Sequence, residues 1–318
     1  MRICSFLPSG TEIVCALGLS DSLRAVSHEC DYPADVLSRP KVVRSRFDSA
    51  KLTSAEIDAA VADLASRGER IYEVDLSVLD AARPDLVITQ QLCEVCAISF
   101  EDVQAAVAHL EAPPRIISLD PSSLSDVLSD VEAVGEATGT SARAAELTQA
   151  LSERIEAVAS KTSPTNTPHG EPAKKVACIE WLDPLIVAGH WIPEMVRLAG
   201  GVDILAEPGA ASRRITFDEL ATGDPDVLVL MPCGMGVDRA VEELSAVDGL
   251  DRWEHLRAVR QGQVYAVDAG ALFSRSGPRL VDGLELLARL IHPEAFPGPL
   301  PDHAARRVPS LPARQTRP

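Results

Sequence analysis

The sequence has no long apolar run and little positive charge. No stretch of its 318 residues approaches the roughly 18 consecutive apolar residues of a membrane-spanning helix, so we expect no stable membrane insertion. The start, MRICSFL, passes directly into Pro8 and Ser9 without the apolar stretch of about 7–15 residues that marks a secretory signal. We therefore expect a cytoplasmic protein.

Basic residues are outnumbered, with 30 Lys and Arg against 47 Asp and Glu, which gives a formal net charge of -17. Such a charge repels the phosphate backbone of nucleic acids, so nucleic acid is excluded as a partner. Hydrophobic residues make up 46% and charged residues 24%, as in ordinary folded proteins. A folded protein with a small-molecule ligand is the class that remains.

Several catalytic motifs are absent. The chain contains no GxxxxGK, no GxSxG and no HExxH, which disfavours the common NTPase, hydrolase and zinc-protease chemistries. Its seven cysteines are an odd number in a long chain, so a disulfide framework is not expected and the cysteines are thiols or metal ligands. The sequence leaves enzymatic activity undecided and favours a binding protein.

What the sequence does contain is an alternation of short β-rich runs with helical patterns, typical of an α/β fold built on parallel sheets. Capping-box spacing of Ser9 with Glu12, and of Thr53 with Glu56, predicts two helix starts, and Gly18 and Gly68 predict the ends of those helices. The expected strands are residues 3–7, 23–27, 86–89, 116–119, 176–180, 227–231 and 264–267, and the expected last helix is 278–291.

Two patterns recur in the same order along the chain. Residues 12–18, EIVCALG, parallel residues 194–200, EMVRLAG, and residues 84–89, PDLVIT, parallel residues 225–230, PDVLVL. The repeat predicts two related Rossmann-like lobes. The expected divisions are an N-terminal lobe at 1–120, a linking helical region at 121–162 that Gly135 or Gly139 interrupts, an exposed loop at 163–174, a C-terminal lobe at 175–292 and a disordered tail at 293–318.

Six segments carry a resemblance to a known family. They are RICSFLPSGTEIVCALGL at 2–19, HECDYP at 28–33, QLCEVCA at 91–97, EWLDP at 180–184, GHWIPEMVRLAGG at 189–201 and SRSGPRLVDGLE at 274–285. Together they are similar to the cobalamin-binding-protein-like branch of the class III, helical-backbone substrate-binding proteins of ABC importers. The resemblance implies two α/β lobes joined by a long backbone helix, with a ligand cleft between the lobes.

The resemblance also concerns a partner. In importer proteins of this kind a surface glutamate from each lobe docks on the permease, and Glu12 and Glu194 occupy corresponding places in the two repeats. Their positions at helix starts favour capping and interaction with the helix dipole over that role. Because we expect no export, we expect no docking on an ABC permease.

Ligands of open parallel sheets bind beyond the carboxyl ends of the strands, which selects the loops that follow each expected strand. Aromatic residues are only 4% of the chain, yet several fall in these loops, where they can line a large planar ligand or simply pack. Arg275 and Arg279 suit an anion or an ion pair between lobes. The predicted ligand-binding residues are Ser9, Gly10, Thr11, His28, Glu29, Asp31, Tyr32, Gln91, Trp181, Asp183, His190, Trp191, Phe273, Arg275 and Arg279.

Cys93 and Cys96 form a CxxC pair, whose spacing lets two thiolates bind one metal ion or join in a redox disulfide. Cys30 in the loop 28–33, and Cys233 after the second-lobe counterpart of the strand that precedes the CxxC pair, would complete a metal-binding set, with His28 as an imidazole nearby. The alternative is that these cysteines are small packing residues. The cofactors considered are a cobalamin-like corrinoid, iron, zinc or an iron-sulfur cluster.

These observations predict a cytosolic binding protein that holds a cobalamin-like or other metal-containing cofactor, for buffering, delivery or sensing. One alternative is a metal- or iron-sulfur-dependent enzyme or metallochaperone that uses the cysteines. The second alternative is the substrate-binding component of an ABC importer.

Overall fold

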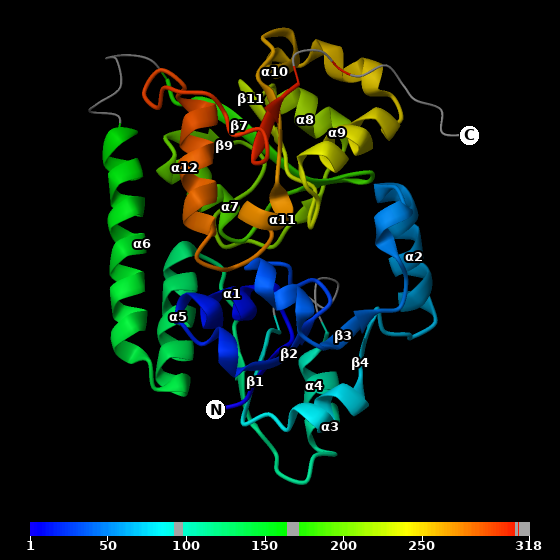
Figure 1. The fold of residues 1–318 in the computed structure, drawn as a ribbon. Coiled ribbons are helices and arrows are strands. Elements are labelled where there is room, and N and C mark those ends of the chain that lie inside the picture. Colours follow the sequence, from blue (N-terminus) through cyan, green and yellow to red (C-terminus); the bar gives the residue numbers. More distant parts are fainter. Residues whose placement is uncertain (92–97, 164–171, 309–310, 312–318) are drawn as a thin grey trace. The chain divides into compact units, whose positions relative to one another are not determined.

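The chain folds into two compact units, each built on its own sheet. A computed structural model describes residues 1–91, 98–163, 172–308 and 311. Unit 1 comprises Met1–Lys51, Ala59–Pro121 and Ser125–Ala150, and unit 2 comprises Leu52–Asp58, Ser122–Leu124 and Leu151–Pro318. The expected two-lobed α/β fold is confirmed (Figure 1). The segment Leu52–Asp58, which the sequence pattern placed inside the first lobe, belongs to unit 2.

Sheet A of unit 1 has the strand order β4-β3-β2-β1-β5-β6 in the described residues. All neighbouring strands are parallel except β4, which runs antiparallel to β3. The strands are β1 (Ile3–Ser5), β2 (Leu23–Ser27), β3 (Lys41–Ser45), β4 (Tyr72–Val74), β5 (Leu86–Thr89) and β6 (Arg115–Ser118). The helices that accompany them are α1 (Pro8–Ala16), α2 (Ser54–Ser66), α3 (Leu76–Ala82), α4 (Phe100–Val107) and α5 (Leu124–Thr138).

Helices pack on both faces of sheet A. Successive side chains of a strand point to opposite faces, so strand neighbours belong to different buried clusters. Ile3 and Ile88 belong to one buried cluster, which includes α1 and α5 residues. Their strand neighbours Cys4 and Val87 belong to a second cluster, which includes α3 and α4 residues. This burial on both faces explains why Ile3–Cys4 and Leu86–Ile88 are continuous apolar runs rather than alternating ones.

Sheet B of unit 2 has the order β10-β8-β7-β11-β12-β13, with β9 paired to β7. Strands β7, β11, β12 and β9 pair in parallel, whereas β8, β10 and β13 add antiparallel edges. The strands are β7 (Lys174–Leu182), β8 (Leu185–Val187), β9 (Gly201–Asp203), β10 (Arg213–Arg214), β11 (Val227–Leu230), β12 (Val264–Val267) and β13 (Ala305–Arg307). The helices are α7 (Ile192–Leu198), α8 (Phe217–Gly223), α9 (Val237–Ala246), α10 (Arg257–Arg260), α11 (Ala269–Leu272) and α12 (Leu280–Ile291).

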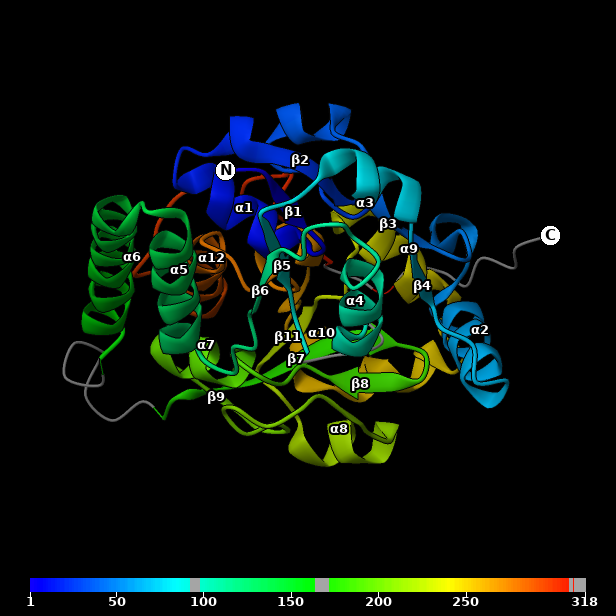
Figure 2. The same cartoon turned by 90° about the horizontal axis from the view of Figure 1, so that it is seen from below.

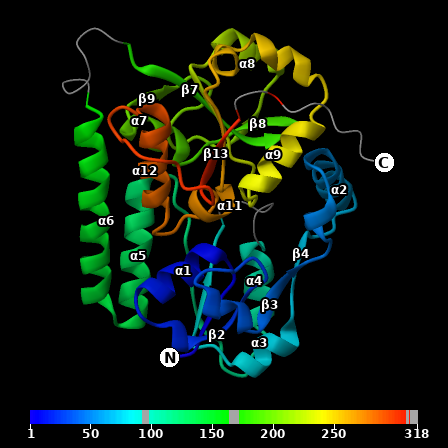
Figure 3. The same cartoon turned by 45° about the horizontal axis from the view of Figure 1, so that its top comes forward.

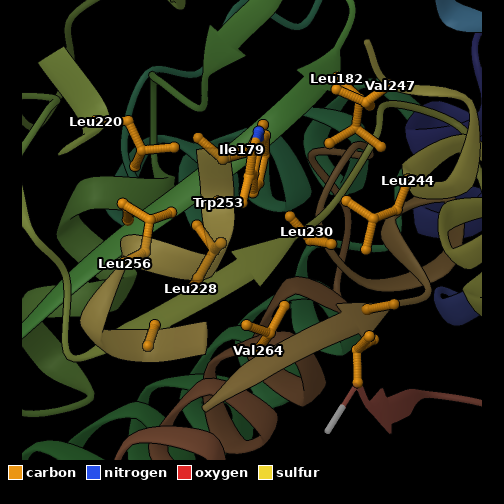
Figure 4. Close-up of a cluster of buried hydrophobic side chains, with 14 of the residues drawn as sticks. Ile179, Leu182, Leu220, Leu228, Leu230, Leu244, Val247, Trp253, Leu256 and Val264 are labelled. Atoms are coloured by element: carbon orange, nitrogen blue, oxygen red, sulfur yellow. The ribbon is translucent and has the colours of Figure 1, made fainter. Parts of the chain in front are cut away.

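Trp253 lies in the middle of the main apolar cluster of unit 2 and is 2% exposed. Figure 4 shows it among side chains from β7, β11 and β12 and from the helices around them. Burying an aromatic side chain of this size is one of the largest single stabilising contributions in a core. The cluster fixes the strands whose carboxyl ends carry several of the predicted ligand-binding residues.

The expected helical region at 121–162 consists of two helices, α5 and α6 (Ser141–Lys161), which lie side by side in Figures 1, 2 and 3. The break falls at Gly139, whose φ of 73° lies in the left-handed region that favours glycine. Gly135 lies inside α5, and glycine is needed there because a Cβ would clash with the Cβ of Ala144 in α6. The first of the two predicted breaks is therefore wrong and the second is confirmed.

The internal repeat has the same contacts in both units. Asp85 precedes β5 and accepts a hydrogen bond from the backbone N–H of Arg2, at 2.7 Å, while Asp226 precedes β11 and accepts one from Lys175, at 2.9 Å. In each case the aspartate ties the start of one parallel strand to its neighbour, β1 to β5 and β7 to β11. The sequence repeat therefore marks equivalent positions in two sheets.

Three local predictions differ from the structure. The first helix begins at Pro8, with Leu7 at the N-cap and no side-chain cap, because proline is already shaped for the first helical position and Ser9 lies within the helix. The last helix begins at Leu280 rather than at Pro278. Within the expected disordered tail, β13 pairs antiparallel with β12, since its backbone groups complete the sheet edge.

Other local predictions are confirmed. Thr53 and Glu56 form the expected capping box at α2: the Thr53 N–H donates to Glu56 Oε2 at 2.7 Å and the Glu56 N–H donates to Thr53 Oγ1 at 3.3 Å. Gly18 and Gly68 follow the ends of α1 and α2 with positive φ values of 75° and 66°. In the described residues, no helix has the length and apolar character to cross a bilayer.

Candidate functional site

The first turns of α1 hold three of the predicted ligand-binding residues in a buried setting. Ser9, Gly10 and Thr11 are all buried. A Cβ at Gly10 would lie 2.7 Å from Cγ2 of Ile88, so glycine lets α1 pack directly on β5. Thr11 Oγ1 lies 3.1 Å from Sγ of Cys30, which brings the loop after β2 onto the helix. These contacts position the carboxyl edge of sheet A.

The loop 28–33 follows β2 and combines a buried thiol with exposed polar groups. His28 Nε2 lies 3.1 Å from Glu29 Oε1, and its Nδ1 lies 3.2 Å from the carbonyl of Val43. Cys30 is 1% exposed, whereas Tyr32 is 48% exposed and precedes a cis peptide bond to Pro33. Asp31 is exposed between them. The loop thus presents an aromatic side chain and carboxylates at the carboxyl edge of sheet A.

The loop after β5 begins with Gln91, whose backbone N–H donates to the carboxylate of Asp120 at the end of β6. That contact joins the exits of two neighbouring strands. Cys93 and Cys96 lie outside the described residues. Their predicted role as metal ligands stays a prediction.

In unit 2, Trp181 lies near the end of β7 and Asp183 lies in the turn between β7 and β8. The Trp181 indole N–H donates to the carbonyl of Ser54, at 3.2 Å, and the side chain is half-buried. Burial raises the pKa of Asp183, and the negative charges of Asp248 and Asp58 add to the effect. A carboxyl group held partly out of water in this way suits hydrogen bonding to a polar ligand atom.

Trp191 and Phe273 come together at the start of α7. The Trp191 indole N–H donates to the Phe273 carbonyl at 2.9 Å, and the side chains are 7% and 3% exposed. His190 adopts a left-handed φ of 54°, and its N–H donates to the carbonyl of Ala210 at 2.6 Å. Burial lowers the pKa of His190, which favours a neutral imidazole able to accept a hydrogen bond or bind a metal.

The loop 231–236 after β11 is tied to both neighbouring loops. The Cys233 N–H donates to the carbonyl of Glu180 at 3.0 Å, and the Gly234 N–H donates to Ser274 Oγ at 3.2 Å. The Gly270 N–H donates to the carbonyl of Met235 at 3.1 Å. Three strand exits therefore form one fixed surface, on which the Cys233 thiol is exposed.

Arg275 and Arg279 belong to the connection from α11 to α12. Both are half-buried, and Arg279 occupies the N-cap position of α12. The Gly277 N–H donates to the carbonyl of Arg275 at 2.8 Å, which folds this connection into a tight turn. Arg275 and Arg279 lie next to the Cys233 loop. Their guanidinium groups place positive charge at the carboxyl edge of sheet B.

Sequence reasoning missed Ser54 and Glu243. The N–H and the Oγ of Ser54 each donate to Glu243 Oε2 at 2.7 Å, and the two residues are 2% and 3% exposed. The Glu243 carboxylate thus accepts hydrogen bonds at the N-terminal end of α2. A negative charge is favoured at that end of a helix. A glutamate at a buried position of an otherwise apolar helix face was the available signal.

Glu194 also has a structural partner. Its Oε2 accepts a hydrogen bond from the backbone N–H of Leu124, at 2.9 Å, so it caps α5 rather than its own helix. Glu194 therefore makes a capping contact with α5, and not with α7, the helix whose start suggested capping. Glu12 is buried, with 4% of its surface exposed.

As to metal binding, no three His, Cys, Asp or Glu side chains come together as a ligand set within residues 1–91, 98–163, 172–308 and 311. Cys30 and Cys233 are placed in unit 1 and unit 2 respectively. The described residues offer aromatic, cationic and carboxylate groups at the strand exits, which is the composition of a binding site for a small molecule.

Comparison with known proteins gives the following. Residues 3–271 match the model of the family described as periplasmic binding protein. The chain is 27% identical to an uncharacterized ABC transporter substrate-binding lipoprotein, YvrC, of Bacillus subtilis, over 93% of this chain and 81% of that protein. It is 23% identical to a vitamin B12-binding protein of Vibrio cholerae, over 89% and 86% of the two chains.

A solved structure agrees with the fold. The crystal structure of a periplasmic heme binding protein from Pseudomonas aeruginosa superposes with a TM-score of 0.69 at 22% identity, covering 100% of this chain and 99% of that one. The match extends over both units and includes the linking helices.

Proposed function

Because the chain belongs to the periplasmic binding protein family, we propose that it is a non-catalytic binding protein for a cobalamin-like ligand. The family resemblance drawn from the sequence motifs is thereby confirmed, and small-molecule binding is its general function. The choice of ligand is supported by the relative named as a vitamin B12-binding protein. A heme or iron ligand is the competing choice, supported by the heme binding protein of the same fold.

In this proposal each unit contributes candidate ligand-binding residues from the loops that follow its strands. In unit 1 these include the loop 28–33 and Gln91, and in unit 2 they include Trp181, His190 and Arg275. The aromatic groups pack against the planar part of the ligand, while the arginines and carboxylates pair with its polar substituents. The hydrogen bonds that tie the Cys233 loop to Glu180 and Ser274 hold the unit 2 residues in place without a ligand.

The test is direct binding to untagged protein purified without oxygen. We expect the absorbance bands of cyanocobalamin to shift at one equivalent, with little response to hemin. Elemental analysis of the protein as purified gives cobalt if the natural ligand is a corrinoid. Iron or zinc near one per chain, together with no response to cyanocobalamin, contradicts the proposal and favours the metal-dependent enzyme or metallochaperone.

The CxxC pair is tested in the same assay. The sequence predicts that replacing both Cys93 and Cys96 by serine abolishes retention of the ligand or metal, because the two thiolates would anchor it. The matched control is Cys15→Ser, a half-buried thiol of α1 outside the proposed ligand set. Unchanged cobalt, iron and zinc content in the double variant would remove the pair from the site.

We propose the cytoplasmic location that the sequence predicts. Cys4, Cys15 and Cys178 are free cysteines, and burial raises the pKa of each thiol. The name of the Bacillus subtilis relative supports the other possibility, an importer component outside the membrane. In the cytoplasm the protein would buffer, deliver or sense its ligand.

A further inference from the structure

A hollow of about 600 Å³ lies in unit 1 away from the loops described above. Three of its lining residues stand at the amino ends of parallel strands: Arg2 precedes β1, Arg24 lies near the start of β2 and Arg83 precedes β5. Helix α3 forms the other wall. The hollow is therefore at the amino edge of sheet A, the opposite edge from the strand exits. It is lined by Arg2, Arg24, Pro40, Ser77, Val78, Ala81, Ala82 and Arg83.

The three arginines differ in their partners. Arg2 is held by Asp85, with Nη2 to Oδ1 at 2.6 Å and Nε to Oδ2 at 3.3 Å. Arg24 and Arg83 are exposed and make no ion pair or side-chain hydrogen bond with any residue in the described part of the chain. Two guanidiniums without an acid partner in a chain with a formal net charge of -17 leave a local excess of positive charge.

The backbone conformation of Arg83 fixes the position of its Cα at the edge of the hollow. Its φ of 44° is left-handed, and its N–H donates to the carbonyls of Leu79 and Asp80, which ends α3. The backbone at this point is thus determined by the helix end and by the strand that follows. The side chain starts from a fixed Cα next to the hollow and needs no loop rearrangement to reach a ligand.

The remaining lining is largely apolar. Val78, Ala81 and Ala82 present one face of α3, Pro40 lies opposite, and Ser77 adds one hydroxyl group. The Ser77 hydroxyl donates to Asp75 Oδ1 at 2.6 Å, so it is engaged in capping its own helix. A ligand in the hollow would contact guanidinium groups at its edge and methyl groups of α3. This lining suits a molecule with an anionic group and a compact apolar part.

We propose that this hollow binds a small amphipathic anion, with a phosphate or carboxylate group paired to Arg24 and Arg83 and an apolar group packed against Val78 and Ala82. Guanidiniums recognise both kinds of anion through paired N–H donors. The site is independent of the proposed cofactor site, because it lies at the other edge of the same sheet.

The experiment uses calorimetric titration of the full chain at low ionic strength with three probes: phenyl phosphate, benzoate and phenol. We expect phenyl phosphate or benzoate to bind at one equivalent and phenol to bind more weakly by at least about tenfold, since it lacks the charge. A tighter phenyl phosphate identifies phosphate as the natural head group, and a tighter benzoate identifies carboxylate. Added salt should weaken either anion.

Two variants locate the binding. Arg24→Gln and Arg83→Asn should each weaken the anionic probe by about tenfold, the loss of one charged hydrogen bond. Asparagine is chosen at Arg83 because it tolerates a left-handed φ. The matched control is Arg115→Gln, which removes an exposed arginine of the same unit that does not line the hollow, and should leave the affinity unchanged.

The proposal is overturned if no anionic probe binds at millimolar concentration, if phenol binds as tightly as the anions, or if Arg115→Gln weakens binding as much as the other two. Circular dichroism of each variant confirms that it is folded. The cyanocobalamin titration of Arg24→Gln and Arg83→Asn should be unaltered, which separates this site from the proposed function.

Discussion

At the scale of single residues, a few carboxyl groups are largely buried from solvent. Asp203, at the end of β9, accepts hydrogen bonds at Oδ1 from the N–H groups of Leu205 and Ala206, both at 3.0 Å. Its Oδ2 is buried and has no hydrogen-bond partner among the residues that the structure describes. Burial, and next the charge of Glu207, raise the pKa of Asp203 from 3.8 to about 6.

This shift predicts a pH dependence of stability. A carboxyl group whose folded pKa is raised stabilises the fold when protonated, so its contribution is complete below about pH 4 and is lost as the pH rises through 6. Asp203→Asn removes the buried charge and keeps the Oδ1 acceptor. We expect it to raise the free energy of unfolding above pH 7 by about 2 kcal/mol and to change it little near pH 4.

Urea unfolding of the two proteins at several pH values measures this effect. Asp85 serves as the control of opposite sign, because its hydrogen bonds with Arg2 lower its pKa to about 2, so that Asp85→Asn should destabilise at neutral pH and matter less in acid. An Asp203→Asn variant that is less stable than the parent at high pH would contradict the argument.

At the scale of elements, a helix end is held by a distant carboxylate. Ser54, in the first turn of α2, gives both its N–H and its hydroxyl to Glu243 of α9, and Arg239 on the same helix donates to the carbonyl of Leu52 at 2.9 Å. Arg214 adds an ion pair with Asp58 at 2.7 Å. Four contacts thus anchor Leu52–Asp58 in unit 2 although the rest of α2 belongs to unit 1.

Glu243→Gln and Ser54→Ala should each lower the free energy of unfolding by about 1 kcal/mol, because the first replaces a charged acceptor by a neutral amide oxygen and the second removes the hydroxyl donor. The double variant should cost little more than the larger single effect, since the two residues act as a pair. Trp181 provides a second readout: its indole donates to the Ser54 carbonyl, so its fluorescence should move toward longer wavelength.

The matched control is Glu242→Gln, because Glu242 is the exposed neighbour of Glu243 on α9. It should leave both the stability and the Trp181 emission unchanged. Equal effects of Glu242→Gln and Glu243→Gln would show that the charge of the helix matters and the buried contact does not.

How well the sequence predicts a strand depends on how much of that strand is buried. Strands β2, β5 and β12 have the predicted bounds because each is a short run whose side chains, apart from that of Arg24, are buried. Strands β8 and β13 were missed: β8 is three residues long, and β13 reads Ala-Arg-Arg, whose place in the sheet comes from backbone pairing with β12. The three residues of β8, Leu-Ile-Val, are apolar but too few to show a strand period, and the edge strand β13 carries no apolar pattern.

At the scale of the whole molecule, the repeat and the family could be predicted from sequence, because the same motif makes the same contact twice. Asp85 and Asp226 are examples, each tying two strands together. The candidate site is predicted only in part. Side chains such as Trp181 and Glu243 find partners far away in the chain, and those pairings depend on the completed fold.

The location is a prediction about the whole molecule. In fractionated cells of the source organism we expect the protein to be recovered with a cytoplasmic marker enzyme. Buried thiols such as Cys4 and Cys178 should react with a thiol reagent only after unfolding, since burial raises the pKa of both. Recovery with the membranes, or a shortened or lipid-modified chain, would support the importer component instead.

The contact between Ser54 and Glu243 spans 189 residues of chain. At translation rates of roughly 5–20 residues per second, the first turn of α2 leaves the ribosome about 10–40 seconds before its partner on α9 is made. During that interval Leu52–Asp58 is part of a unit whose sheet does not yet exist. Complete folding of unit 2 is therefore a late event in synthesis, and a nascent chain stalled before α9 would keep this segment open to chaperones and proteases.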